Sequence, residues 1–416
     1  MPLELVPAAS KEEVLLCQTN NYELWGAPLT LEQYQHRDNI NYGTSYMAID
    51  REQPEQSNGA VYFVLKDSAT GVIESACEIL IRDCWVKRAG RLVDARSAVL
   101  GSVYTVEKYR NKGNASVMMK ELLRQLRKTY LTGDCDVAFL YSEVGEYYSR
   151  FGYRSFNVPV FVFDITAQDD RSTKIGASCA VEYETLYMDY AEVADDYRGR
   201  IRKLVERDTD TDSAAFAFAL KPTAGLFEWF ANRARAIYWA VQHPDAHAPP
   251  AVEHERASGS TVDPALTVPT GYLVRHPTAD APGLSYVSFY PEFHTGDCYV
   301  TAMHAHDVAT AVVLMDLVLK QCAVWKLRKV YAWSTDVGDF DNTGRDPLAA
   351  VDRLQHAFAT AAGPSPSGSS VAFRVQDTNH SLSAIQALHR TSNTDPARPQ
   401  EPFVTRWEGN GKWCWF

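Results

Sequence analysis

The stretch that decides the fold is VLGSVYTVEKYRNKGNASVMMKELL, Val99 to Leu123. Its first part is rich in β-branched and aromatic residues, which predicts a strand over Ala98–Val106. After Asn114, apolar residues recur at spacings of three and four, as on one face of a helix: Ala115, Met118, Met119, Leu122, Leu123, Leu126 and Tyr130. The stretch therefore predicts a strand, a short loop and a long amphipathic helix.

The loop between them, YRNKGNAS, is the first candidate site. A glycine-containing loop that enters a helix presents free backbone N–H groups and the positive end of the helix dipole, which together suit an anion. Gly113 permits a positive φ or a close backbone approach, and Arg110 and Lys112 add positive charge. Taken alone, such a string is also compatible with a surface loop whose charges are simply solvated.

The flanking sequence predicts a mixed α/β first half. Strands are expected at Val61–Lys66, Val72–Arg82, Val137–Tyr141 and Val158–Phe163, and helices at Lys11–Asn20 and Thr30–Arg37. Asp67–Gly71 is expected to form a hairpin turn, and SEVGEYYSRFGY a short helix closed by Gly152. The polar stretch Asp164–Ser178 predicts a boundary between domains 1–170 and 180–416.

The second half repeats the order of the first. Strands are expected at Tyr272–His276, Leu284–Tyr290, Cys298–Met303 and Lys329–Ser334, and helices at Asp196–Asp208, Thr223–Gln242 and His306–Leu327. The string VYAWSTDVGDF after the last helix is similar to VAFLYSEVGEYY in the first half. We therefore predict an internal structural duplication whose second copy lacks the phosphate-binding loop, with 243–270, 363–370 and 391–402 as loops.

Bulk properties limit the class of protein. A chain of 416 residues is long for one core, and its net charge of −11 argues against nucleic acid as a partner. The eight cysteines are scattered without a CxxC pair, and no export signal is visible at the start, so we expect reduced thiols and a cytoplasmic protein. The longest apolar run, Val308–Trp325, contains Asp316 and Lys320 and predicts a core helix and no membrane span.

Two strings together resemble a known family. Arg110-x-x-Gly113-x-Ala115 is similar to the pyrophosphate loop of the GNAT superfamily of N-acetyltransferases, and YYSRFGY to its tyrosine-bearing helix. The resemblance covers residues 98–163 and implies a GNAT fold that takes acetyl-CoA as co-substrate. It further implies a second, GNAT-like domain in the C-terminal half.

A narrower resemblance extends along more of the chain. WGAPLTLEQYQHRD, SACEILIR, GSVYT, YSEVGEYY and the Trp-Cys of KWCWF resemble, in order and spacing, the fungal lysine N6-acetyltransferase family. It implies acetylation of the side-chain amine of free L-lysine, a step of lysine catabolism. Two rivals stay open: a broad-specificity amine acetyltransferase of the two-GNAT enhanced-survival type, and a non-catalytic CoA-binding protein.

The resemblance also implies roles for particular residues. Strand residues near Val103–Val106 are expected to polarise the thioester, and Tyr148 to protonate the departing thiolate. The expected cofactor contacts are Val103, Tyr104, Thr105, Val106, Arg110, Asn111, Lys112, Gly113, Asn114, Ala115, Ser116 and Ser142.

Residues for the acceptor amine are less constrained by the sequence. Glu78 is the candidate base: the alternation Ala76, Glu78, Leu80 places it either on a buried face beside the cofactor strand or in water. Glu143 and Glu146 either bind the amine or cap the helix. The terminal segment, with Trp413 and Phe416, is expected to help close the acceptor pocket. No metal site is expected, since His294, His304 and His306 lack an acidic or cysteine partner at diagnostic spacing, and the sequence leaves the oligomeric state open.

Overall fold

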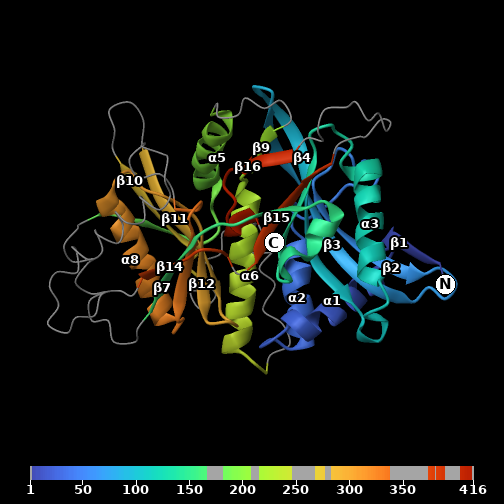
Figure 1. Ribbon diagram of the computed structural model, residues 1–416. Helices are drawn as coiled ribbons and strands as arrows, with labels where there is room; N and C mark the ends of the chain where they lie inside the picture. The colour runs from blue at the N-terminus through green and yellow to red at the C-terminus, as the bar shows by residue number, and fades with distance from the viewer. Residues whose placement is uncertain are drawn as a thin grey trace.

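Two β-sheets carry the architecture, and helix α6 (Ala224–Gln242) stands between them in Figure 1. The computed structural model describes residues 2–165, 181–207, 215–245, 268–276, 283–337, 373–379, 381–388 and 403–414. The predicted loops 363–370 and 391–402, and most of 243–270, lie outside these ranges. The mixed α/β class expected from the sequence is confirmed.

The first sheet is built mainly from the N-terminal half. Its strand order is β1 (Leu3–Pro7), β2 (Gly59–Asp67), β3 (Ile73–Arg88), β4 (Arg91–Thr105), β5 (Val137–Ser142), β15 (Leu382–Ala387) and β6 (Arg154–Phe156). Strand β9 (Ala215–Leu220) pairs with the far end of β3, and β16 (Phe403–Trp407) pairs with β9. β2, β3 and β4 form an antiparallel meander, whereas β4 and β5 are parallel.

The second sheet follows the same plan. Its order is β14 (Phe373–Gln376), β7 (Val160–Asp164), β13 (Lys329–Trp333), β12 (Asp297–His304), β11 (Gly283–Glu292), β10 (Gly271–His276) and β8 (Glu184–Leu186). β10, β11 and β12 are antiparallel, and β12 and β13 are parallel.

The helices lie close to where the sequence predicts them. α1 (Lys11–Trp25) and α2 (Leu31–Tyr42) are each longer than expected, and α2 begins with a capping box formed by Thr30 and Gln33. α3 (Asn114–Gln125) continues into a π-helical turn at Leu126–Tyr130, and α5 (Ala191–Glu206) and α8 (Val308–Val324) follow in the second half. Short 3₁₀ helices occur at η1 (Glu107–Tyr109), η3 (Gly145–Phe151) and η6 (Lys412–Cys414).

The structural repeat is visible in the connection of the central strands. β4, α3 and β5 form a parallel crossover, as do β12, α8 and β13. In each copy the strand before the helix carries an extra residue against its antiparallel neighbour, between Ala76 and Glu78 in the first sheet and between Ser288 and Phe289 in the second. Two crossovers with a bulge at the same stage support an internal duplication.

The two sheets exchange strands across the polar stretch that follows β7. β7 precedes that stretch but pairs with β13 in the second sheet, whereas β9, β15 and β16 follow it and join the first. The division into 1–170 and 180–416 stays a prediction, and strand pairing links the two parts in both directions.

A shared core reinforces this link. Leu80, Val99 and Phe139 of the first sheet belong to the same apolar cluster as Tyr286 and Trp333 of the second. The opposite face of the first sheet packs its Cys77, Ile79 and Ile81 against α3. Because burial of one large apolar side chain contributes about 1.5–3 kcal/mol, this cluster holds the two sheets firmly together.

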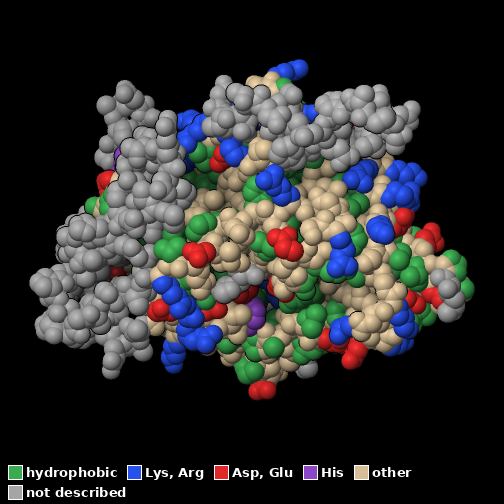
Figure 2. Space-filling model, viewed as in Figure 1, with side chains coloured by type: hydrophobic (Ala, Val, Ile, Leu, Met, Phe, Trp, Pro, Cys, Tyr) green, Lys and Arg blue, Asp and Glu red, His purple; other side chains and the backbone are tan. Residues whose placement is uncertain are grey.

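The surface carries mixed charge. Figure 2 shows acidic and basic side chains interspersed over the face in view. Among the described residues, no helix is both long and apolar enough to cross a membrane.

Candidate active site

The central feature is an opening between β4 and β5. These parallel strands pair only from Ser97–Val137 to Leu100–Leu140, although β4 runs on to Thr105 and stays paired with β3. The edge of β4 beyond Leu100 that faces β5 is therefore released from the ladder. Backbone groups along it are available to a ligand.

The bulge lies at this opening. On β4, Ser102 and Val103 oppose the single residue Cys77, and Ser102 has a φ of 51°. Val106 donates its N–H to the Glu74 carbonyl on β3, so the N–H of Thr105 points to the opposite edge, toward the opening. Of the predicted backbone contacts, Val103 and Thr105 thus have a suitable position, and the N–H of Val106 is already used.

The predicted anion loop lies directly beyond β4. Gly113 adopts the left-handed conformation at φ 86°. A Cβ at this position would point into open space, with no heavy atom within 4 Å apart from its chain neighbours. Gly113 is the N-cap residue of α3. Because glycine has no side chain, it accepts no hydrogen bond from the first backbone N–H groups of the helix. Arg110, Asn111 and Lys112 are exposed beside it. This geometry suits a pyrophosphate group.

Other expected cofactor contacts serve the loop itself. Arg110 donates from Nε to the Thr105 carbonyl at 2.9 Å and lies over the Tyr104 ring, which fixes its direction. Asn114 is buried and donates to the Glu74 carboxylate at 2.6 Å. Ala115 and Ser116, in the first turn of α3, are half-buried.

Ser142 ends β5 on the other side of the opening. Its hydroxyl donates to the Gly145 carbonyl at 2.6 Å and accepts from the Val144 N–H at 3.2 Å. The side chain therefore stabilises the turn into η3, and any cofactor contact would have to coexist with these two bonds.

Tyr148 is positioned by that turn. Its side chain is buried, with its ring 5.2 Å from Tyr147 and 6.1 Å from Tyr153. Burial first, and then the Cys77 thiol opposite the bulge, raise the pKa of Tyr148 above its ordinary value. The phenol is therefore protonated at neutral pH near the bulge, and the raised pKa also makes it a weaker acid than an exposed tyrosine.

Glu78 is buried, at 4 % exposure, which confirms the first of the two placements left open by the sequence. Its Oε2 accepts from the Ser102 hydroxyl at 3.2 Å, and its Oε1 has no hydrogen-bond partner among the described residues. Burial first, then the Asp38 carboxylate, raise the pKa of Glu78 well above its ordinary value, although Arg233 and Arg37 oppose the shift. A carboxylate in this state is a stronger base than an exposed one.

The remaining predicted acceptor residues within the described ranges are two exposed glutamates and a buried tryptophan. Glu143 and Glu146 are exposed in the β5–η3 region, and Glu146 accepts a hydrogen bond from Ser155 at 2.7 Å. Trp413 is fully buried against Tyr197, so its ring contributes to the core. Phe416 lies outside the described residues.

Three charged residues near Glu78, and a fourth near Arg233, are not among the site residues that the sequence predicts. Arg37 and Asp38 form a buried ion pair on α2, with Nη2 and Oδ1 2.6 Å apart. Arg233 on α6 donates to the Tyr290 hydroxyl at 3.0 Å. Lys412 lies over the Tyr299 ring at 4.4 Å, and burial lowers its pKa to about 8. The sequence does carry a signal in α2: the polar residues Gln33, Arg37 and Asn41 recur every four positions, on the face of the helix that is buried.

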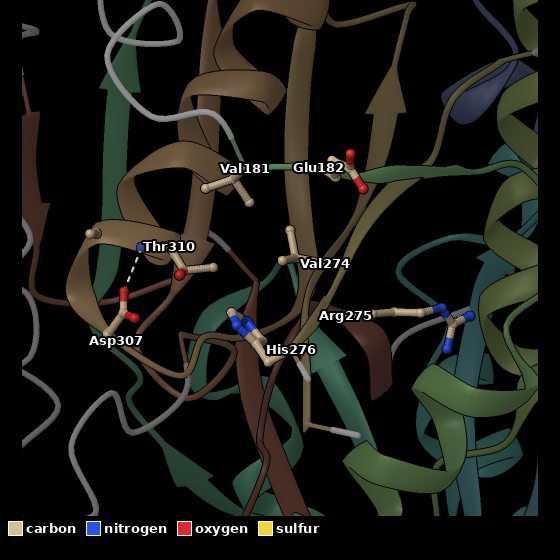
Figure 3. Close-up of a pocket in the computed structure, with 8 residues that line it drawn as sticks. Val181, Glu182, Val274, Arg275, His276, Asp307 and Thr310 are labelled. Atoms are coloured by element: carbon tan, nitrogen blue, oxygen red, sulfur yellow. Dashed lines mark hydrogen bonds between the residues drawn. The ribbon is translucent and has the colours of Figure 1, made fainter. Parts of the chain in front are cut away.

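A separate cavity of about 390 Å³ lies in the second half, at the start of α8. Figure 3 shows Asp307 bonded to the Thr310 N–H there and Arg275 pointing away from the cavity. This is the position that corresponds to the anion loop of the first copy. A carboxylate caps the helix at this point, so the cavity is unsuited to a phosphate group, as the sequence predicts for the second copy.

The described residues contain no group of three or more His, Cys, Asp or Glu side chains arranged to hold a metal ion. His276 and His306 stack at 5.0 Å beside the second-half cavity, without an acidic ligand set around them.

Comparison with known proteins gives two curated relatives. The chain is 28 % identical over 245 residues to an uncharacterized protein of Saccharomyces cerevisiae, which covers 51 % of this chain and 59 % of that protein. It is 23 % identical over 276 residues to a lysine acetyltransferase of Yarrowia lipolytica, which covers 58 % of this chain and 68 % of that protein. The chain thus spans less than two thirds of the Saccharomyces protein.

Among solved structures, a GCN5-related N-acetyltransferase from Kribbella flavida matches with a TM-score of 0.46 and 14 % identity, over 93 % of this chain and 72 % of that one. No family model matches the chain. The expected resemblance to a fungal lysine acetyltransferase is confirmed, as a resemblance, by the Yarrowia relative.

Proposed function

We propose that this chain is an acetyl-CoA-dependent N-acetyltransferase that converts free L-lysine into N6-acetyl-L-lysine. One observation carries the proposal: the opening between β4 and β5 has an uncapped helix N-terminus at one end and Glu78 and Tyr148 at the other. The similarity to the Yarrowia lysine acetyltransferase favours lysine over other amines.

The cofactor is expected to lie along the opening. The Gly113 loop and the first N–H groups of α3 would bind the pyrophosphate, with Arg110 and Lys112 adding charge. The free edge of β4 would bind the pantetheine arm, and the bulge at Ser102 and Val103 would bring backbone N–H groups to the thioester oxygen. No metal enters this scheme.

The reaction requires a neutral amine, because a lysine ammonium with a pKa near 10.4 is almost fully protonated at neutral pH. Glu78, whose Oε1 is free of partners among the described residues, would accept the proton. The amine nitrogen would then attack the thioester carbon, and the C–S bond would break to release a thiolate. Tyr148 would protonate that thiolate, the second proton released by the acylated nitrogen would restore the Tyr148 phenol, and Glu78 would pass its proton to solvent.

The direct test is to incubate the purified chain with acetyl-CoA and L-lysine and to follow both free thiol and N6-acetyl-lysine. Release of thiol in step with the acetylated product would support the proposal. Equal rates with polyamines and aminoglycosides would favour a broad amine acetyltransferase instead, and CoA binding without any thiol release would favour a binding protein. We further propose a place in cytoplasmic lysine catabolism, for which acetylation of free L-lysine is a necessary condition.

A further inference from the structure

Helices α2 and α6 pack against each other in opposite directions. At one end, Gln33 Nε2 donates to the His243 carbonyl at 3.4 Å, and Tyr34 and Ile237 share an apolar cluster. At the other end, a Cβ on Gly225 would lie 3.1 Å from the Tyr46 Cβ, just after α2 ends. The register therefore brings the helical turn after Tyr34 opposite the turn before Ile237.

Those two turns carry Asp38 and Arg233. Asp38 accepts both Arg37 bonds on its Oδ1, at 2.9 and 2.6 Å, which leaves its Oδ2 without a partner among the described residues. Arg233 uses its Nε for Tyr290, and its terminal nitrogens have no hydrogen-bond partner in the described part of the chain. No ion pair within 4 Å joins Asp38 to Arg233.

Glu78 completes the constellation. It lies opposite Tyr62 across the β2–β3 ladder, and the rings of Tyr62 and Tyr42 of α2 are 5.3 Å apart. Asn41 is buried one turn after Arg37 and Asp38, and neither polar atom of its amide has a hydrogen-bond partner among the described residues. Glu78 Oε1 also lacks a partner among them. Buried polar atoms that lack partners are rare in proteins, and several in one region indicate a polar ligand.

We infer, on the basis of the proposed function, that Arg233 binds the α-carboxylate and Asp38 the α-ammonium of a free amino acid whose terminal amine reaches Glu78. A facing carboxylate and guanidinium that do not pair with each other match the two charges of a zwitterion. An arginine with free terminal nitrogens suits a carboxylate, which accepts two parallel bonds. The site thereby selects a free diamino acid over a lysine within a peptide, where both α-groups are amides.

The test compares three acceptors that differ only at the α-end: L-lysine, cadaverine without the carboxylate, and 6-aminohexanoate without the α-amine. For Arg233→Met, we expect kcat/KM to fall at least about tenfold for L-lysine and 6-aminohexanoate and to stay within about twofold for cadaverine. For Asp38→Asn, the loss should fall on L-lysine and spare 6-aminohexanoate. Arg235→Met, on the same helix, is the control for loss of an arginine and should leave all three unchanged.

A parallel titration separates this inference from the proposed reaction. L-lysine and cadaverine are titrated by calorimetry into CoA-loaded wild type and Arg233→Met. Binding of L-lysine that is specifically lost in the variant supports the inference even if no acetylation occurs. In the kinetic comparison, an equal loss of kcat/KM for all three acceptors would overturn the inference. In the titration, a wild type that binds cadaverine as tightly as L-lysine, or that does not bind L-lysine, would also overturn it.

Discussion

Replacement of Glu78 by glutamine tests the catalytic base and the energetics of burial in one variant. The substitution keeps the size of the side chain and the bond from Ser102, and it removes only the titration. The carboxyl group is buried, and its pKa is raised well above 4.5 by burial and by Asp38. Two independent consequences follow, one for the rate and one for the stability.

The rate consequence concerns the deprotonated form of Glu78. In the wild type, kcat/KM for L-lysine should fall as the pH drops below the raised pKa of Glu78, because the base becomes protonated. Glu78→Gln should lower kcat by about 10²–10⁴ and abolish that acidic limb. CoA binding should stay intact, since the loop at Gly113 is separate from Glu78.

The stability of the wild type should change with pH in the direction opposite to its rate: the rate rises as Glu78 loses its proton, and the free energy of unfolding falls. A carboxyl group whose folded pKa is raised contributes stability below its unfolded pKa, and this contribution is lost as the pH rises through the folded pKa. Glutamine does not titrate, so the variant should gain stability relative to wild type as the pH rises. Each unit of pKa elevation corresponds to about 1.4 kcal/mol.

Thermal unfolding from about pH 4 to about pH 9 measures how this stability difference changes with pH, and steady-state kinetics over the same range measure the rate. Glu4→Gln, an exposed carboxylate on β1, is the control and should change neither. A Glu78→Gln enzyme with a normal pH profile would refute the role as base. A constant difference in Tm across the range would refute the buried, pKa-shifted carboxyl group.

Four further substitutions test the rest of the site. Arg110→Glu should raise KM for acetyl-CoA at least about tenfold, because a charge-assisted hydrogen bond contributes about 1.5–3 kcal/mol. Lys120→Glu, at an exposed position of α3, is the control and should leave KM unchanged. Equal effects of the two substitutions would contradict the anion loop. Tyr148→Phe should lower kcat by about 10²–10⁴ with unchanged CoA binding, and a rate within about twofold of wild type would exclude it as the acid. Gly113→Val should weaken CoA binding, because a β-branched residue at φ 86° costs about 1–2 kcal/mol or more; unchanged binding in titrations would argue against this backbone geometry. Trp413→Ala should destabilise the fold by about 3–5 kcal/mol, measured by denaturant unfolding, and a raised KM for lysine at unchanged stability would instead support direct binding.

The local parts of the site could be predicted because their signals are local. The strand, the glycine and the helix that follow one another from Val99 to Leu123 are encoded by neighbouring residues, and the structure has them in that order. The release of β4 from β5 beyond Leu100 is less visible, since it depends on the bulge opposite Cys77. No periodicity in β4 itself indicates that bulge.

The strand exchange could not be predicted for a different reason. Residues of β7 read as a plain apolar strand that follows the first half, and its partner β13 lies far along the chain. Strands β9, AFAFAL, and β1, LELVP, are not predicted from the sequence. β9 is wholly apolar and shows no apolar–polar alternation, and β1 has five residues and ends in a proline. Which strand pairs with which depends on contacts between segments that are far apart in the sequence, so local patterns do not indicate it.

The acceptor end of the site is the clearest case of a feature that only the fold creates. Asp38 alone reads as a helix residue beside an arginine, and Arg233 as one of several arginines on α6. Their meaning comes from the antiparallel packing of α2 and α6, which places a carboxylate oxygen and a guanidinium opposite each other near Glu78. Since α6 belongs to the second half and Glu78 to the first, each half would supply part of the proposed site for a zwitterionic acceptor. The shared core and the exchanged strands connect the two halves. In the site that we propose, a second copy without a phosphate loop would supply Arg233, and the first copy would supply the reacting centre.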